Sequence, residues 1–254
     1  MATVDQERLH NLYNASHYKD NTSDWEDSAS SYRADAFYIA LCLAGIHDSV
    51  NSFLDVGCGS GGVLMQLYKK YGSMLNSGNT TFHGVDLSIN AIEIANKLYP
   101  KSKDNNISFT VGSYNNSPSD NYDVVSIIHV LEHCPDMLEM LSECEMKGQY
   151  LYINVPIEVN IFYSFRKKVL VNQYKKYGHL HFFNEDFFVC WLEQNGFKLI
   201  SIVYSSDFEV VKSGFSYNLM QLLRRWCGRL IGPSRAMWLL GGYSLGVLVK
   251  SRKE

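Results

Sequence analysis

Apolar runs and amphipathic segments alternate through the middle of the chain. Short runs rich in apolar and β-branched residues predict strands at 52–56, 81–86, 107–112, 122–128 and 149–155. Between these runs, apolar residues at helical spacing predict helices at 61–71, 88–98 and 136–146. Because strands alternate with helices, we expect an α/β fold with a parallel sheet and right-handed crossovers.

Further segments flank this alternation. The pattern predicts helices at 28–45 and 184–194 and strands at 197–204 and 243–249. The polar residues 1–27 carry spaced aromatic side chains and are expected to form a flap over a bound ligand. Two stretches, 161–177 and 205–240, have a less regular pattern, although the second contains an amphipathic run at 219–231.

A glycine-rich turn follows the first predicted strand. The run Leu54–Leu64 reads as a buried strand, a glycine turn and the first turn of a helix. Gly57 and Gly59 lack a Cβ atom, so they can adopt positive φ and let a ligand approach the backbone. The first N–H groups of the following helix point towards such a ligand. We therefore expect a nucleotide-like ligand at this turn.

An acid at the turn distinguishes two kinds of nucleotide. Gly57, Gly59 and Gly62 match the G-x-G-x-x-G spacing of dinucleotide sites. Asp55, two residues before the first glycine, would repel a pyrophosphate and attract a cationic amine or sulfonium. The acid favours a sulfonium cofactor, and a nicotinamide-dependent oxidoreductase stays as the alternative.

The run Leu54–Gly61 resembles the first motif of class I S-adenosylmethionine-dependent methyltransferases, an acid followed by G-x-G-x-G. Later segments follow the order of the same family. The second predicted strand ends at Asp86, which by this resemblance accepts both ribose hydroxyls. The third is followed by Ser113 and Tyr114, where relatives contact the adenine. The segment His129–Asp136 is similar to the Leu-Glu-His segment of small-molecule methyltransferases.

The resemblance implies a fold and a cofactor. The fold is a doubly wound, Rossmann-like seven-stranded sheet, mostly parallel with an antiparallel last strand, in a single domain over 1–254. That domain comprises an N-terminal flap and helix (1–48), a cofactor-binding half (49–156) and lid insertions (157–183 and 205–240). The implied cofactor is S-adenosyl-L-methionine, with S-adenosyl-L-homocysteine as product. The residues implied to hold it are Asp55, Gly57, Cys58, Gly59, Gly61, Asp86, Leu87, Ser113, Tyr114 and His129.

The implied reaction is methyl transfer to a small-molecule acceptor. We expect a hydroxyl acceptor, as in a sugar, a glycan precursor, a lipid quinone precursor or a secondary metabolite. A hydroxyl must lose its proton, and histidine is the natural general base. His129 and His181 are the favoured bases, and His133 and His179 are the other candidates. N-Methylation and a non-catalytic methyltransferase fold remain alternatives.

The segment His129–His133 also matches the H-x-x-E-H arrangement of a zinc peptidase group, whose histidines share one helix face. The β-branched run 124–128 leads directly into His129. This element is therefore predicted to be the carboxyl end of a strand, where open α/β sheets bind ligands. We predict no metal site here.

Composition narrows the partners and the compartment. A net charge of -3 gives no general attraction to nucleic acid. Six cysteines without a C-x-x-C pair and a polar amino terminus predict a cytoplasmic protein. The apolar run 238–249 is too short and too rich in glycine to span a bilayer, so no stable membrane insertion is expected.

Basic and aromatic side chains gather in the two lid segments. The basic ones are Arg166, Lys167, Lys168, Lys175, Lys176, Arg224, Arg225 and Arg229. They favour an acceptor that carries phosphate or carboxylate, and the aromatic ones, Phe162, Tyr163, Phe165, Tyr174 and Tyr177, suit stacking on a sugar. The segment 205–240 is also a candidate surface for a homodimer.

Overall fold

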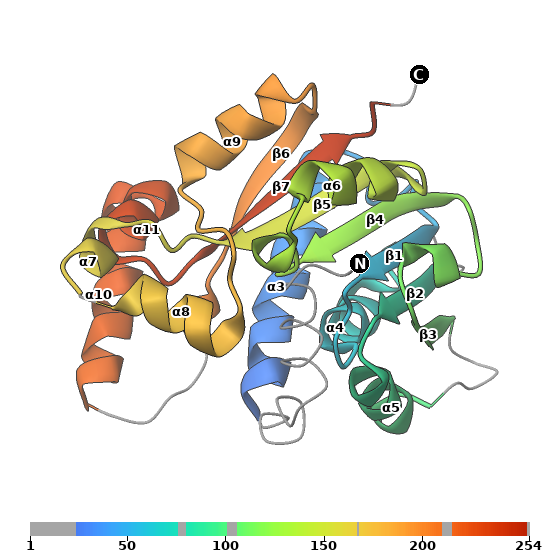
Figure 1. Cartoon of the computed structure of the whole chain (residues 1–254), viewed down its shortest axis with the longest axis horizontal. Coiled ribbons are helices and arrows are strands. Elements are labelled where there is room, and N and C mark those ends of the chain that lie inside the picture. Colours follow the sequence, from blue (N-terminus) through green and yellow to red (C-terminus); the bar gives the residue numbers. More distant parts are fainter. Residues whose placement is uncertain (1–23, 76–79, 101–105, 167, 210–214, 253–254) are drawn as a thin grey trace.

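The computed structural model, which describes residues 24–75, 80–100, 106–166, 168–209 and 215–252, contains a seven-stranded sheet (Figure 1). The strands are β1 (Ser52–Val56), β2 (Thr81–Asp86), β3 (Ile107–Val111), β4 (Tyr122–Ile128), β5 (Gly148–Pro156), β6 (Lys198–Ser205) and β7 (Ser244–Lys250). Their order is β3-β2-β1-β4-β5-β7-β6. The first five strands pair in parallel, and β7 runs antiparallel to β5 and β6. The predicted fold class is confirmed.

Helices connect the strands and cover the sheet. The α-helices are α3 (Asp24–Leu43), α4 (Gly62–Tyr71), α5 (Ile89–Leu98), α6 (Met137–Glu145), α7 (Ile161–Ser164), α8 (Val169–Tyr177), α9 (Glu185–Gln194), α10 (Phe215–Ile231) and α11 (Pro233–Leu240). Short 3₁₀ turns are η2 (Tyr114–Asn116), η3 (Leu131–His133) and η4 (Asp207–Glu209). Figure 1 shows α7, α8, α10 and α11 grouped at one end of the molecule.

Alternating residues of the strands build two cores, one on each face of the sheet. On β1, Phe53 packs among residues of α3, α4 and α5, whereas the next residue, Leu54, packs among residues of α6 and α9. On the first face, Phe37 of α3 stacks on Tyr152 of β5 with ring centroids 4.2 Å apart. This alternation is the period of two that a strand buried on both faces requires.

Two sequence predictions need correction. The stretch 205–240, expected to be irregular around one amphipathic run, forms η4 and then two helices, α10 and α11. Gly232, with φ of 86°, separates these helices, and Pro233 occupies the first turn of α11. The N-terminal helix begins at Asp24 rather than near 28. The predicted flap at 1–27 lies, up to residue 23, outside the described residues.

The strand order determines where the loops meet. β1 continues to β2 on one side, and β4 later pairs with its other side, so the chain changes direction between β1 and β4. In open α/β sheets, ligands bind outside the carboxyl ends of the strands at such a point. Within the described part of the chain, no helix is long and apolar enough to cross a membrane.

Candidate functional site

The glycine turn after β1 has the backbone conformation that the sequence predicted. Gly57, Gly59 and Gly61 have φ of 75°, 56° and 80°, in the left-handed region that favours glycine. The N–H groups of Gly57 and Cys58 donate to one carbonyl of β2 at 2.8 and 3.0 Å. A Cβ atom at Gly61 would lie 2.4 Å from the ring of Phe109 on β3. Both the conformation and the close packing therefore exclude larger residues at Gly61.

Asp55, the acid of the turn motif, is buried on β1. Its Oδ1 accepts a hydrogen bond of 2.6 Å from the Ser126 hydroxyl on β4. Burial raises the pKa of Asp55 to about 7, the Ser126 hydrogen bond opposes this shift, and the charge of Asp86 adds to it. A cation placed beside this carboxyl would favour its ionised form and release its proton.

Asp86, the acid at the end of β2, joins the strand to the glycine turn. Its Oδ2 accepts the N–H of Gly59 at 2.9 Å, and its Oδ1 accepts the N–H of Ser88 at 2.8 Å. Burial raises the pKa of Asp86, while these two hydrogen bonds lower it. A carboxylate has about four lone-pair positions, so Asp86 keeps acceptor capacity for ribose hydroxyls.

The remaining predicted cofactor residues occupy different environments. Cys58 is buried, and burial together with the charges of Asp55 and Asp86 raises the pKa of its thiol. Leu87, directly after Asp86, is 77% exposed. Ser113 caps η2 by accepting the Asn115 N–H at 3.3 Å, and Tyr114 packs at the edge of the core. The exposed Leu87 is thus the apolar side chain available to a ligand beside Asp86.

His129 follows β4 with an unusual backbone conformation, a positive φ of 56°. Its Nε2 lies 2.9 Å from the Ser244 hydroxyl and 3.2 Å from Asp207 Oδ2, and its Nδ1 lies 3.4 Å from Glu132 Oε1. Burial and the charge of Arg33 lower the pKa of His129, but the two carboxylates outweigh them and raise it overall. The imidazolium form of His129 is therefore more favoured than that of an ordinary histidine, with an acid at each nitrogen.

Arg33 and Asp207 complete this network, and the sequence analysis did not identify either of them. Arg33 of α3 donates to Asp207 Oδ2 from Nε at 3.2 Å and from Nη2 at 3.1 Å. The hydroxyls of Ser205 and Ser244 also donate to Asp207, at 2.5 and 2.7 Å. Burial raises the pKa of Asp207, but Arg33 and His129 hold it well below its usual range. No local pattern signals a pair 174 residues apart.

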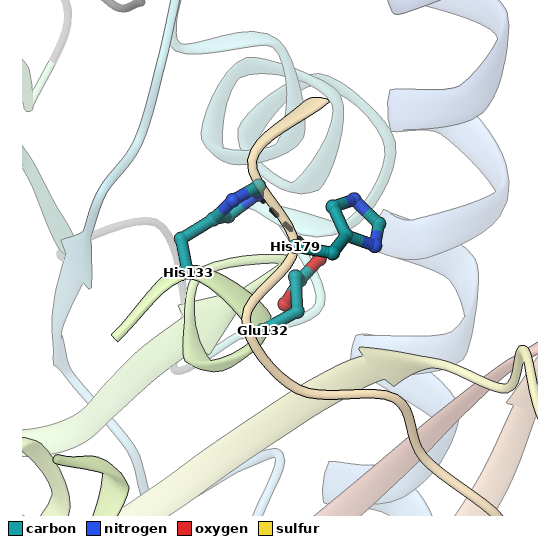
Figure 2. A group of neighbouring side chains, drawn as sticks. All are labelled: Glu132, His133 and His179. Carbon is teal, nitrogen blue, oxygen red and sulfur yellow. Dashed lines mark ion pairs between the residues drawn. The ribbon is translucent and has the colours of Figure 1, made fainter. Parts of the chain in front are cut away.

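A second histidine cluster lies where the segment after α8 crosses η3 (Figure 2). Glu132, His133 and His179 have ligand atoms that all lie within 4.8 Å of one another. The N–H groups of Leu180 and His181 donate to the carbonyl of Glu132 at 2.6 and 3.1 Å. These backbone bonds hold the crossing segment against η3, so His179 comes close to Glu132 despite the distance in sequence.

His181 lies next to this cluster with a different partner. Its Nε2 is 2.8 Å from the carbonyl oxygen of Cys134. A carbonyl only accepts, so Nε2 carries the proton and Nδ1 of the neutral ring carries the lone pair. The other three candidate histidines, His129, His133 and His179, each have a ring nitrogen within 4.0 Å of a buried carboxylate. His181 instead donates to the backbone.

The chain matches a protein-family model, and its fold is similar to those of solved structures. A family model described as a methyltransferase domain matches residues 30–202. Among solved structures, the magnesium protoporphyrin IX methyltransferase of Synechocystis PCC 6803 with bound S-adenosylhomocysteine superposes with a TM-score of 0.60 at 15% identity. The match covers 97% of this chain and 99% of that one.

Two curated relatives match parts of this chain at 24% and 30% identity. A ubiquinone biosynthesis O-methyltransferase of Coxiella burnetii is 24% identical over 199 residues, which is 73% of this chain and 81% of the relative. A protein of the same name from Serratia proteamaculans is 30% identical over 110 residues, 42% of this chain and 41% of the relative. The chain thus spans under half of the Serratia relative.

Proposed function

Because the chain belongs to the family of methyltransferase domains, we propose that it transfers a methyl group from S-adenosylmethionine to a hydroxyl of a small, negatively charged acceptor. S-Adenosylmethionine is the methyl donor of this class I family. The observation that supports this donor most strongly is the glycine turn with its two acids, whose negative charge would repel a pyrophosphate and attract a sulfonium. The nicotinamide alternative is therefore not retained.

The proposed cofactor site uses the acids for two tasks. Asp86 would accept the ribose hydroxyls while Gly59 keeps it in place, and Leu87 would pack against the adenine, with Ser113 and Tyr114 on the adjoining loop. Asp55 would balance the positive charge of the methionine part, and the turn formed by Gly57, Cys58, Gly59 and Gly61 would contact it through the backbone.

The charge of the lid segments supports an anionic acceptor. The two lid segments, 157–183 and 205–240, contain ten of the 23 basic residues of the chain and three of its 26 acidic residues, Glu158, Asp207 and Glu209. These segments therefore carry a net charge of +7, whereas the chain as a whole carries -3. A cationic amine acceptor would be repelled there, whereas a phosphate or carboxylate would be attracted. We therefore favour O-methylation over N-methylation.

His181 is the proposed general base. In the transfer, the acceptor oxygen bonds to the methyl carbon while the carbon–sulfur bond breaks, and sulfur keeps the electron pair. The hydroxyl proton passes to Nδ1 of His181, the ring nitrogen that does not donate to Cys134. His129 has a carboxylate at each nitrogen and is less suited to accept this proton. We assign it to holding Asp207 and Glu132 in position.

The compartment and the oligomeric state belong to the same proposal. All six cysteines are free thiols in the described part of the chain, which supports a reducing cytoplasm. The outward face of α10 carries Leu219, Leu222, Leu223 and Trp226, each at least 44% exposed. This apolar face supports the expected homodimer surface, and sedimentation of the purified chain tests it.

Calorimetry with S-adenosylhomocysteine tests the donor. We expect saturable binding by the wild type and a Kd raised roughly 10- to 100-fold in Asp86→Ala, since charged hydrogen bonds contribute about 1.5–3 kcal/mol each. Asp48→Ala, an exposed acid before β1, is the matched control and should bind like the wild type. Absence of binding by the folded wild type would refute the donor assignment.

Acceptor screening tests the second half of the proposal. Release of S-adenosylhomocysteine is measured with pairs of alcohols that differ only in a phosphate or carboxylate group. Phosphorylated or carboxylated members should have the higher kcat/KM, and Lys175→Glu with Lys176→Glu on α8 should reduce that preference. Lys97→Glu on α5 serves as control. Equal rates for charged and neutral members would contradict the anionic acceptor.

The base is tested with whichever acceptor the screen finds. His181→Gln should lower kcat by roughly 10²–10⁴-fold, the range that general-base catalysis contributes, while the Kd of S-adenosylhomocysteine stays unchanged. His47→Gln is the control, because His47 precedes β1 and is not one of the candidate bases. Wild-type kcat in His181→Gln would assign the base elsewhere.

A further inference from the structure

The cluster of Glu132, His133 and His179 has a property that the methyl-transfer proposal does not use. Each of the two histidines engages its Nδ1 in a hydrogen bond outside the cluster. His133 Nδ1 lies 3.3 Å from the Gly178 carbonyl oxygen, and His179 Nδ1 lies 2.7 Å from Glu158 Oε2. With the protons at Nδ1, both Nε2 atoms carry the lone pairs. Histidines that ligate metals are oriented in this way.

Glu132 supplies an acid to the same place. It is 1% exposed, and neither carboxylate oxygen has a hydrogen-bond donor among the described residues. Its Oε1 lies 3.4 Å from His129 Nδ1 and 4.0 Å from His133 Nε2, both outside good hydrogen-bond geometry. A buried carboxylate without a donor is costly unless a charge compensates it. The His129 ring beside Oε1 compensates part of this charge, and a cation between Glu132 and the two cluster histidines would compensate the rest.

The outer partners are as well buried as the ligands. Glu158, which accepts from His179, is 4% exposed, and His179 itself is 9% exposed. The rings of His133 and His179 stand almost perpendicular, at 88°, with centroids 4.9 Å apart. Figure 2 shows both rings and the Glu132 carboxylate, which come from two segments, η3 and the segment after α8. The three side chains therefore surround one point between two segments of the chain.

From this geometry we infer that Glu132, His133 and His179 bind one divalent transition-metal ion. Metal–ligand bonds of about 2.0–2.2 Å put neighbouring ligand atoms roughly 3.4 Å apart in a tetrahedral site. The cluster therefore has to contract by about an ångström on binding. Two imidazoles and one carboxylate favour Zn²⁺ and its first-row neighbours over Mg²⁺ or Ca²⁺, which prefer oxygen ligands alone.

The ion would have two consequences for the chain. It would tie the segment that leads out of the lid helix α8 to η3, and so fix the lid relative to the end of β4. Three protein ligands also leave at least one coordination position for water or another oxygen ligand. Neither consequence requires methyl transfer, so the inference does not depend on the proposed function.

Metal titration of the full-length chain tests the inference. The protein is stripped with a chelator and titrated with Co²⁺, which absorbs in the visible range when nitrogen and oxygen ligands bind it, and then with Zn²⁺. We expect one equivalent of Co²⁺ to bind with a visible absorption band and Zn²⁺ to displace it. The melting temperature should rise with the bound metal, because a ligand of the folded state stabilises it.

Matched variants separate the site from adventitious binding. His133→Gln and His179→Gln should each weaken Zn²⁺ binding by at least about 100-fold, and Glu158→Gln, which changes only the outer partner, by roughly 10- to 100-fold. His47→Gln removes a histidine outside the cluster and should bind like the wild type. Calorimetry with S-adenosylhomocysteine on each variant reports folding, and its result is independent of the metal result.

Each outcome decides the inference. Saturable binding that is lost in the two histidine variants, while S-adenosylhomocysteine still binds, supports it. No saturable Co²⁺ uptake by the folded wild type overturns it, and so does uptake that is equal in wild type and His179→Gln. Should both histidine variants fail to fold, Glu158→Gln decides, since it leaves all three ligands in place, and a Zn²⁺ affinity equal to that of the wild type would overturn the inference.

Discussion

Asp55 and Asp86 lie near the carboxyl ends of neighbouring strands, but their surroundings differ in how far they stabilise a negative charge. Asp86 accepts two backbone N–H groups, which help to hold its charge. Asp55 has one hydroxyl donor in a fully buried position, so the cost of burying its charge is met only in part. A cationic ligand would supply the missing compensation. Binding of such a ligand should therefore depend on the protonation state of Asp55.

This dependence gives a prediction on pH. With a pKa of about 7 in the ligand-free protein, Asp55 is ionised above pH 7 and protonated below it. A cationic cofactor binds the ionised form, so its Kd should rise by up to about tenfold for each pH unit below 7 and level off above it. Calorimetric titrations with S-adenosylmethionine between pH 5 and pH 8.5 measure the profile.

Two variants check the assignment to Asp55. Asp55→Asn should bind more weakly and lose the slope. Ser126→Ala removes the hydroxyl that lowers the pKa of Asp55, so the bend in the profile should move to higher pH. For the ligand-free protein the sign is opposite. The raised pKa makes Asp55 destabilising as pH rises from about 4 towards 7, and Asp55→Asn should be the more stable form at pH 8.

A comparison of Gly61 with Gly45 separates the cost of backbone strain from the cost of overpacking. Gly61 has φ of 80°, and a Cβ atom there would lie 2.4 Å from the Phe109 ring. Gly45 has a similar φ of 67°, but a Cβ atom there would meet nothing within 4 Å. Gly45→Ala should cost about 1 kcal/mol for its backbone alone, and Gly61→Ala should cost about 1–3 kcal/mol more for overpacking. Urea unfolding measures both, and equal losses would show that the Phe109 ring moves aside freely.

Among the elements, α3 is attached to the rest of the fold by two ion pairs of different burial. Arg33 pairs with Asp207 of η4, with side chains 15% and 17% exposed, and Lys70 of α4 pairs with Asp35, at 33% and 36%. Exposed pairs contribute little, whereas removing one partner of a buried pair leaves a charge uncompensated. The Arg33 pair should therefore dominate the attachment of α3.

Substitution of the two cations tests this ranking. Arg33→Met should lower the free energy of unfolding by about 3–5 kcal/mol, because Asp207 would retain only His129 and two hydroxyls. Lys70→Met should lower it by less than about 1 kcal/mol. Urea unfolding provides the measurement. If Arg33→Met lowers the free energy of unfolding only slightly, then His129 alone compensates the charge of Asp207. The contribution of His129 to stability would then be larger than its contacts suggest.

The proposed lid helices and the proposed cofactor-binding half share one continuous sheet, so we expect the chain to unfold as a unit. β6 and β7 frame the lid helices α10 and α11 in sequence, and β7 pairs with β5 of the cofactor half. Calorimetry should show one cooperative transition, as expected for the single domain predicted over 1–254. S-Adenosylhomocysteine at 100 times its Kd adds about 2.7 kcal/mol, which should raise Tm by roughly 5–10 °C. Two separate transitions would contradict the single domain.

Local patterns in the sequence predicted most of the fold and the glycine turn after β1. Strand and helix positions follow from periodicity over a few residues, and the turn at Gly57 to Gly61 follows from backbone freedom that belongs to glycine. Asp55 was predicted from its place before the glycine turn and Asp86 from the family resemblance, and the parallel pairing of β1 and β2 puts both at the same edge of the sheet. The errors at 205–240 arose where a Gly-Pro break interrupts a helical pattern.

Contacts between side chains that lie far apart in the sequence depended on tertiary packing instead. Arg33 meets Asp207, and His179 joins Glu132 and His133, because strand order and the backbone bonds between η3 and the segment after α8 bring them together. No short-range preference encodes such meetings, since the free energy that holds them comes from burial of the whole sheet. The sequence alone identified the acids and histidines as residue types, but only the tertiary structure determined which acid contacts which histidine.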